Sequence, residues 1–169
     1  VEGKMDEIKL DPGKTYQTIE GFGYTLTGAS AMLINAMDPA PRAALLKELF
    51  DRKDGIGISY LRISVGASDL HTDVFTYDDV AEGQTDNSLI HFSLDKDNTG
   101  GTGLIPLLQE ILRIQPSLHI LASPWTAPAW MKDNQSFKGG SLKKTCYSTY
   151  ALYLAAYIKK MKAEGVNIE

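Results

Sequence analysis

Residues 56–65 of the sequence read IGISYLRISV, an apolar stretch rich in β-branched side chains. Such a composition is typical of a buried β-strand. Because successive side chains of a strand alternate between its two faces, Leu61 and Ile63 are predicted to face covering helices. Arg62 and Ser64 are predicted to face the other way. The stretch is therefore predicted to be a central strand with one apolar face and one polar face.

Segments of helical length alternate with strands on both sides of this stretch. Before it, residues 27–37 are predicted to be a helix with Thr27 as a candidate N-cap. A second helix is predicted to begin at Asp38-Pro39 and to stop at Gly55. After it, residues 104–115 are predicted to be a helix and residues 118–123 an apolar strand. Such alternation favours a parallel sheet with crossover helices, so the predicted fold class is α/β.

The last part of the chain is predicted to be one more helix. Tyr150, Leu154, Ile158 and Met161 follow helical spacing and are expected to share its buried face, before Gly165 ends it. The final residues then look like the approach to another strand. A complete (β/α)8 barrel needs roughly 250 residues, so a chain of 169 residues is expected to supply only part of one.

Two further segments stand outside this alternation. Residues 8–10 and 15–19 are predicted to form a short β-hairpin around a Pro-Gly turn at residues 11–14. Residues 66–103 form a long polar segment without a clear helix or strand pattern. Loops of this length inside a compact domain are usually functional, so this segment is expected to carry function.

Composition argues against several classes of function. The net charge is −4 and no run of Lys or Arg is present, which argues against nucleic acid as a partner. No apolar run is long enough to span a membrane. Cys146 is the single cysteine, so no disulfide can form within the chain. The first ten residues have no signal-peptide pattern, which leaves the compartment open.

Candidate functional residues follow from the positions of the strand ends, because ligands of parallel α/β structures bind at the carboxyl ends of the strands. If the sheet closes into a barrel, Arg62 points inside, where its charge needs an anionic or carbonyl partner. Asp69 follows the same strand in a loop, where aspartates commonly serve as caps or turn residues. Spacing alone leaves both a structural and a functional role open for these two residues.

Both tryptophans of the chain lie in one segment, SPWTAPAWMK at residues 123–132. The flat face of an indole suits the C–H-rich face of a sugar ring, and packing at the barrel rim is the alternative. Trp125 directly follows the predicted strand and is expected to face a pocket, whereas Trp130 is expected to pack. Pro124 and Pro128 restrict the loop and lower the entropic cost of binding.

Two other ligand classes are poorly supported. The dinucleotide fingerprint needs a third glycine after the Gly-Phe-Gly of residues 21–23, and that position holds Leu26. Asp69, His71 and Asp73 are three polar residues of a polar loop, which is weak support for a metal site. We therefore expect neither a cofactor nor a metal.

Several motifs, taken together and in order, are similar to a known family. They are QTIEGFG (17–23), GISYLRIS (57–64), ASDL (67–70), FTY (75–77), LASPWTAPAWMK (121–132) and GGSLK (139–143). The chain closely resembles the glucosylceramidase-like branch of glycoside hydrolase family 30, which also contains endo-β-1,6-glucanases. The resemblance covers nearly the whole chain, and several motifs in one order are more specific than any single one.

The resemblance implies a retaining β-glycosidase on a (β/α)8 TIM barrel with a side β-sandwich. Residues 1–19 would contribute to the sandwich, and residues 20–169 would form about three βα units, ending before strand four. In the family, the arginine of the second strand lies beside the nucleophile, which matches Arg62. The aspartate after it binds sugar hydroxyls, which matches Asp69. The tryptophan of the Ser-Pro-Trp motif lines the sugar subsite, which matches Trp125.

The resemblance also places both catalytic glutamates outside this chain. The family's acid/base glutamate lies in an Asn-Glu-Pro motif at the end of strand four, and its nucleophile lies on strand seven. The sequence has no Asn-Glu-Pro, and Glu169 falls before the expected strand four, so no catalytic residue is assigned. One further departure is Tyr24, where family members usually have a small residue after Gly-Phe-Gly, and it leaves the subsite shape open.

The expected function of the full-length protein is hydrolysis of a β-glucosidic bond through a covalent glycosyl-enzyme intermediate. β-1,6-Glucan and a glucosylceramide-like substrate both remain open. The expected partners are this β-linked glucoside, the remaining half of the barrel and the side β-sandwich, and the family resemblance implies an extracellular or periplasmic location. The alternative is a non-catalytic carbohydrate-binding or structural α/β domain that keeps the Trp125 platform without the glutamates.

Overall fold

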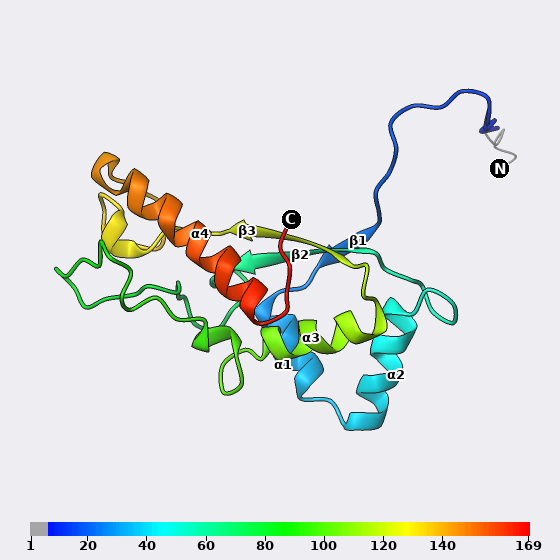
Figure 1. The fold of residues 1–169 in the computed structure, drawn as a ribbon, viewed down its shortest axis with the longest axis horizontal. Helices are drawn as coiled ribbons and strands as arrows, with labels where there is room; N and C mark the ends of the chain where they lie inside the picture. Colours follow the sequence, from blue (N-terminus) through cyan, green and yellow to red (C-terminus); the bar gives the residue numbers. More distant parts are fainter. Residues whose placement is uncertain (1–6) are drawn as a thin grey trace, which may run out of the picture.

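A parallel sheet organises the protein (Figure 1). The computed structural model describes residues 7–169. The sheet has the order β1-β2-β3 and contains the strands β1 (Gly23–Thr25), β2 (Tyr60–Val65) and β3 (His119–Pro124). Both pairings are parallel, and Arg62 lies opposite Thr25 on one side and Leu121 on the other. The predicted parallel α/β arrangement is confirmed.

The central strand β2 begins at Tyr60 rather than at Ile56. Gly57 has a positive φ of 69°, a conformation outside the strand region. The N–H of Ile56 donates to the carbonyl of Glu48 at 2.7 Å, and the N–H of Ile58 donates to that of Leu49 at 2.9 Å. These residues are therefore bonded to the end of the preceding helix instead of to a neighbouring strand, and Ile56 is 70% exposed.

Four α-helices of the described residues connect and cover the strands: α1 (Gly28–Asn35), α2 (Pro39–Phe50), α3 (Leu104–Ile114) and α4 (Tyr147–Ala163). Short 3₁₀ helices lie at Asp95–Asp97, Ala129–Met131 and Lys144–Cys146. The helix α3 packs against both α1 and α2. Among residues 7–169, no helix combines the length and the apolar character that crossing a bilayer requires.

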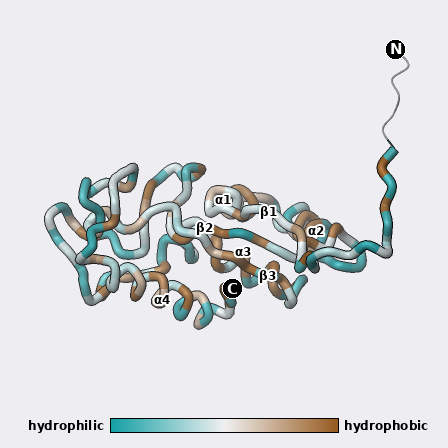
Figure 2. The backbone as a smooth tube through the Cα atoms, turned by 90° about the horizontal axis from the view of Figure 1, so that it is seen from above, coloured by the Kyte–Doolittle hydropathy of each residue, from teal (hydrophilic) through white to brown (hydrophobic). Residues whose placement is uncertain are grey.

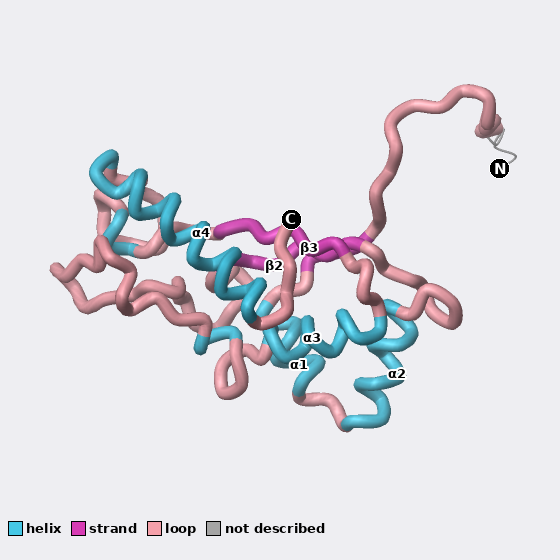
Figure 3. The backbone as a smooth tube through the Cα atoms, in the orientation of Figure 1, coloured by secondary structure: helices cyan, strands magenta, loops and turns pink. Residues whose placement is uncertain are grey.

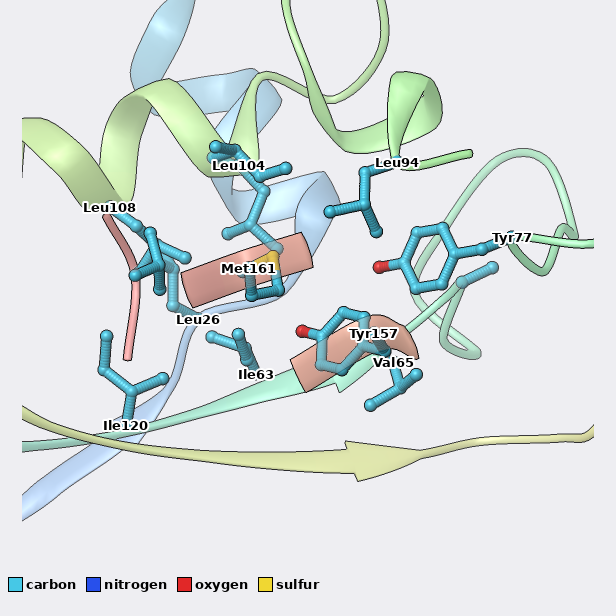
Figure 4. Close-up of a cluster of buried hydrophobic side chains, with 14 of the residues drawn as sticks. Leu26, Ile63, Val65, Tyr77, Leu94, Leu104, Leu108, Ile120, Tyr157 and Met161 are labelled. Carbon is cyan, nitrogen blue, oxygen red and sulfur yellow. The ribbon is translucent and has the colours of Figure 1, made fainter. Parts of the chain in front are cut away.

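The helices bury one face of the sheet. Leu61, Ile63 and Ile120 are fully or almost fully buried, and Figure 4 shows the last two pointing toward Leu108 of α3 and Met161 of α4. Figure 2 shows that hydrophobic residues gather along β2 and α3, while the outer loops are largely hydrophilic. On the opposite face of the sheet, Arg62 and Leu121 are exposed. The alternation predicted for the central strand is confirmed, although Ser64 is buried at the strand end.

The buried face of α4 differs from the predicted one. Met161 is buried as expected, but Ile158 is 47% exposed, and Tyr153 and Tyr157 lie on the buried face instead. The reason is an aromatic stack that helical spacing alone does not indicate. The ring of Tyr77, from the long loop after β2, stacks on Tyr157 with centroids 5.4 Å apart and an interplanar angle of 13°.

The loop of residues 66–103 is folded although it contains no strand or α-helix (Figure 3). Phe75, Tyr77 and Phe92 belong to the main hydrophobic core. The hydroxyl of Tyr77 donates to the buried carboxylate of Asp97, which also accepts a hydrogen bond from Thr102 at 2.8 Å. The predicted polar loop is therefore held to the helices by buried aromatic and carboxylate side chains.

The predicted N-terminal hairpin is wrong within the described residues. Residues 7–20 form no strand and extend away from the sheet (Figure 1). The expected turn is present, with the N–H of Lys14 donating to the carbonyl of Asp11 at 3.1 Å, but no second strand pairs across it. The first strand of the described residues is β1, which begins at Gly23, after the predicted hairpin strands of residues 8–10 and 15–19. Residues 1–6, part of the segment assigned to a side β-sandwich, lie outside the described residues.

The last described residues return to the sheet. Val166 is buried, and the N–H of Glu169 donates to the carbonyl of Ile120 in β3 at 3.0 Å. The carboxylate of Glu169 lies 2.7 Å from Nδ1 of His119. The chain thus approaches β3 on the side away from β2, where the sequence predicts the approach to another strand.

The N-cap of α1 allows a direct test of local stability. The Thr27 hydroxyl accepts a hydrogen bond from the N–H of Ser30 at 3.1 Å, and the residue is buried. In the full-length protein, Thr27→Val keeps the side-chain shape but removes the acceptor, so we expect a loss of about 1–2 kcal/mol in the free energy of unfolding.

Thr27→Ser is the matched control, because it keeps the hydroxyl and removes only a methyl group. Urea denaturation should show a smaller loss for Thr27→Ser than for Thr27→Val. Equal stability of the two variants would show that the cap contributes nothing.

Candidate functional site

The carboxyl ends of β2 and β3 lie side by side. Ser64 pairs with Ser123, and Val65 pairs with Pro124. The loop that carries Asp69 and the loop that carries Trp125 therefore leave the sheet at the same edge. This is the edge at which parallel α/β proteins bind ligands.

Trp125 lines a cavity of about 530 Å³ at this edge. Its side chain is 37% exposed, and Phe137 and Tyr150 contribute two further aromatic rings to the lining. The remaining lining residues are Pro124, Thr126, Ala127, Lys132, Lys138, Gly139, Gly140 and Leu142. An aromatic wall beside polar donors has the chemistry that suits a sugar ring. The sequence placed Trp125 next to a pocket but did not identify Phe137, from the same connection between β3 and α4, or Tyr150, from α4 itself.

Lys132 holds one wall of this cavity together. Its ammonium group donates to Oγ1 of Thr126 at 3.2 Å and to the carbonyl of Phe137 at 3.2 Å. The residue is buried, so its charge is fixed within the wall of the cavity. Sequence reasoning missed Lys132, because a lysine in a polar loop has no pattern that distinguishes a buried ammonium from a solvated one.

Trp130 is 7% exposed and belongs to the core, as predicted. Its indole N–H donates to the carbonyl of Asp78 at 2.9 Å. The carbonyl of Trp130 accepts a hydrogen bond from the ammonium group of Lys143 at 2.9 Å. The indole of Trp130 thus joins the long loop after β2 to the loop after β3. Trp130 is buried in the core, whereas Trp125 is partly exposed at the cavity.

Arg62 lies on the face of the sheet that the helices leave open, and its position inside a closed barrel stays a prediction. The guanidinium is exposed on the open face of the sheet, and it forms no ion pair with any residue from 7 to 169. It lines a separate cavity of about 280 Å³ together with Gly21, Gly23, Tyr24, Thr25 and Tyr60. Burial of Arg62 requires strands opposite this face, because three strands do not enclose an interior.

Asp69 is exposed in the loop after β2. Its carboxylate forms no hydrogen bond or ion pair with the described part of the chain, and its neighbours Ser68 and His71 are bonded to each other instead. Across residues 7–169, no three His, Cys, Asp or Glu side chains gather in a way that could hold a metal ion. The weakly supported trio of Asp69, His71 and Asp73 therefore does not assemble.

Buried carboxylates of the long loop were not anticipated from the sequence. Asp78 is fully buried, and neither of its carboxylate oxygens has a hydrogen-bond donor among residues 7–169. Burial, followed by the charge of the nearby Asp86, raises the pKa of Asp78 to about 6. Asp86 is also buried, and its carboxylate accepts a hydrogen bond from the N–H of His91 at 2.7 Å. When Asp78 is protonated, its carboxyl group can donate a hydrogen bond to the neighbouring carboxylate of Asp86.

The fold and the site together define the beginning of a (β/α)8-barrel domain with a ligand site at the carboxyl ends of its strands. Residues 19–168 match the glycosyl hydrolase family 30 TIM-barrel domain. The chain therefore belongs to glycoside hydrolase family 30, as the motifs in the sequence indicated.

Curated relatives and solved structures agree with this assignment. The chain is 37% identical over 165 residues to an endo-1,6-beta-D-glucanase of Neurospora crassa, covering 94% of this chain and 33% of that protein. It is 33% identical over 166 residues to the lysosomal acid glucosylceramidase of Mus musculus, covering 95% of this chain and 31% of that protein.

A solved endo-beta1,6-glucanase superposes with a TM-score of 0.82 at 38% identity, covering 94% of this chain and 35% of that one. SrfJ from Salmonella typhimurium superposes with a TM-score of 0.84 at 28% identity, covering 93% and 34%. The chain thus spans about a third of the length of the relatives that it matches.

The buried Asp78 carboxyl predicts a pH dependence of stability. Its pKa of about 6 lies above the value of 3.8 that it has when exposed, so the folded state binds this proton more tightly than the unfolded state. The resulting stabilisation is present below about pH 4 and is lost as the pH rises through about 6.

In the full-length protein, Asp78→Asn should therefore raise the free energy of unfolding at pH 7 by about 1–2 kcal/mol relative to its effect at pH 4. Glu82→Gln, which neutralises an exposed carboxylate of the same loop, is the matched control. Urea denaturation at the two pH values measures the difference. The prediction fails if the free energy of unfolding depends on pH in the same way in Asp78→Asn and Glu82→Gln.

Proposed function

We propose that the full-length protein is a retaining β-glycosidase that hydrolyses β-glucosidic bonds through a covalent glycosyl-enzyme intermediate. The observation that carries this proposal is the aromatic cavity around Trp125, at the same edge of the sheet as the exposed carboxylate of Asp69. Membership of glycoside hydrolase family 30 supports the reaction class. The relatives named endo-1,6-beta-D-glucanase and glucosylceramidase support β-1,6-glucan or a glucosylceramide-like molecule as the substrate.

Trp125 supplies the platform on which the sugar ring stacks in this proposal. The indole is exposed over about a third of its surface, and Pro124 and Pro128 on either side restrict the backbone. A preformed aromatic face binds a sugar at a lower entropic cost than a mobile one. The ammonium group of Lys132 donates to Oγ1 of Thr126, the residue that follows the tryptophan, and so restrains the loop next to the indole.

Asp69 binds sugar hydroxyls in this proposal. Its carboxylate is exposed and unpaired among the described residues, so its acceptor oxygens are available to O–H donors. Hydrogen bonds to a charged acceptor are about twice as strong as neutral ones, and they accelerate the reaction where they strengthen in the transition state.

Arg62 lies beside the nucleophile carboxylate in the proposed complete barrel. The guanidinium faces the side of the sheet that the helices leave open, which becomes the interior when the barrel closes. An adjacent positive charge favours the ionised carboxylate and lowers its pKa, which keeps the nucleophile ready to attack. The same ion pair would satisfy the arginine once it is buried.

The two catalytic glutamates are proposed to lie in the remaining part of the barrel. A retaining mechanism needs two carboxyl groups about 5–5.5 Å apart, one as nucleophile and one as acid/base. We further propose that the segment before Gly21 joins a side β-sandwich and that the protein acts outside the cytoplasm. Both proposals rest on the family resemblance.

The substrate-binding role of Asp69 is tested by kinetics of the full-length enzyme. Asp69→Ala should lower kcat/KM for a β-glucoside by about 100-fold or more, because two or three charge-assisted hydrogen bonds are lost. Asp73→Ala, an exposed aspartate of the same loop, is the matched control and should leave kcat/KM within about twofold. A value of kcat/KM close to that of the wild type for Asp69→Ala would contradict the assignment of Asp69 as a substrate-binding residue.

The isolated 169-residue chain is expected to show no glycosidase turnover and to be poorly stable. It presents unpaired backbone groups at the edges of an open three-stranded sheet, and it lacks the pair of carboxylates that the mechanism requires. Release of glucose from a β-glucoside by the purified chain would refute this expectation, and circular dichroism on heating reports its stability.

A further inference from the structure

His71 closes the turn that presents Asp69. The N–H of His71 donates to the carbonyl of Ser68 at 3.2 Å, and the N–H of Ser68 donates to Nδ1 of the His71 ring at 3.0 Å. Oγ of Ser68 lies 3.1 Å from the same ring nitrogen and accepts a hydrogen bond from the N–H of Leu70 at 3.3 Å. These contacts surround Asp69 on both sides along the chain, and none of them uses its carboxylate.

The contacts determine which nitrogen of the ring carries the proton. A backbone N–H can only donate, so Nδ1 of His71 must present a lone pair to Ser68. The proton of the neutral ring therefore resides on Nε2. A doubly protonated imidazolium has a proton on both nitrogens and cannot accept this hydrogen bond.

The far side of the ring is enclosed by the start of α1. A Cβ atom on Gly28 would lie 2.1 Å from Nε2 of His71, so the glycine provides the space that the ring occupies. The ring also meets Phe75 edge-on, with centroids 5.5 Å apart and an interplanar angle of 84°. Nε2 is buried without a hydrogen-bond partner among residues 7–169. The ring is therefore confined by packing on one side and hydrogen-bonded at Nδ1 on the other.

The surroundings of His71 favour the neutral ring. Burial lowers the pKa of His71, and the carboxylate of Asp97 in the 3₁₀ helix Asp95–Asp97 opposes this effect. The positive end of the α1 dipole lies on the Nε2 side, at Gly28, and also disfavours a second proton. Asp69 and Asp73, the charged residues nearest to His71 in the sequence, are exposed.

We propose that His71 is a positioning residue for substrate binding, whose neutral ring holds the turn of residues 68–71 so that the Asp69 carboxylate faces the sugar hydroxyls. Protonation of the ring removes its acceptor from Ser68 and releases the turn. His71 then acts only through Asp69 and touches no substrate itself. This inference rests on the proposed glycosidase function, because it assumes that Asp69 binds sugar.

The first test compares two substitutions in the full-length enzyme. His71→Asn places Oδ1 close to the position of Nδ1 and keeps an acceptor for Ser68, but it does not titrate. His71→Leu has a similar bulk and no acceptor. At pH 7 we expect KM for a β-glucoside to rise about fivefold to tenfold in His71→Leu, with a smaller change in kcat. His71→Asn should recover most of this loss.

The second test is the pH profile of KM. Because burial lowers the pKa of His71 in the folded protein, the ring is still neutral and the turn intact at the usual histidine pKa of about 6.5, and the turn loosens only as the pH falls through the lowered pKa. The wild-type KM should therefore rise on acidification more steeply than that of His71→Asn. His91→Asn, an exposed histidine of the same loop, is the matched control and should retain the wild-type profile.

A readout without catalysis separates this inference from the proposed function. In NMR spectra of the full-length protein, the His71 ring should appear as the Nε2–H tautomer, and the Ser68 amide should exchange more slowly in wild type and His71→Asn than in His71→Leu. If the wild-type protein cleaves no β-glucoside, the proposed function fails, while these two measurements still report on the turn.

The outcomes that overturn the inference are specific. A wild-type KM and a wild-type Ser68 exchange rate in folded His71→Leu would show that the ring does not position Asp69. If His71→Leu does not fold, the pH profile of His71→Asn decides: an acid rise of KM as steep as in wild type would overturn the proposal, and a flatter one would support it.

Discussion

The parallel pairing of β2 with both of its neighbours is the constraint on which the rest of the structure depends. It places the carboxyl ends of β2 and β3 at one edge, with Val65 opposite Pro124, so the loops that carry Asp69 and Trp125 must emerge together. Because side chains alternate along β2, one face of the sheet packs against the helices and the other face is open. Leu61 and Ile63 pack beneath the helices, and Arg62 is exposed on the opposite face.

The long loop after β2 is a structural element of the site. Tyr77 anchors it to α4 by stacking on Tyr157, and the carbonyl of Asp78 accepts the indole N–H of Trp130 from the loop after β3. The loop after β2 and the loop after β3 are therefore joined by this hydrogen bond. Polar groups buried in this junction have few partners, which explains why the pKa of Asp78 lies near 6.

Much of the fold was predicted correctly from local patterns. The errors concern features that depend on contacts with other parts of the chain. The Thr27 cap and the face alternation of β2 were predicted correctly, because each depends on a few neighbouring residues. The hairpin around residues 11–14 was predicted from a turn that does form, but no strand pairs across it in the described chain. The buried face of α4 was misjudged because Tyr157 is buried by a loop far away in sequence.

The sequence by itself determined the α/β class, the family, and the different environments of Trp125 and Trp130. Strand periodicity, ordered motifs and position relative to a strand end can each be recognised from neighbouring residues of the sequence. Only the tertiary structure decided that Phe137 and Tyr150 complete the cavity, that Lys132 is buried in its wall, and that the ring of His71 turns toward Ser68. These contacts depend on which distant segments meet and how deeply they are buried, and residue spacing along the chain records neither.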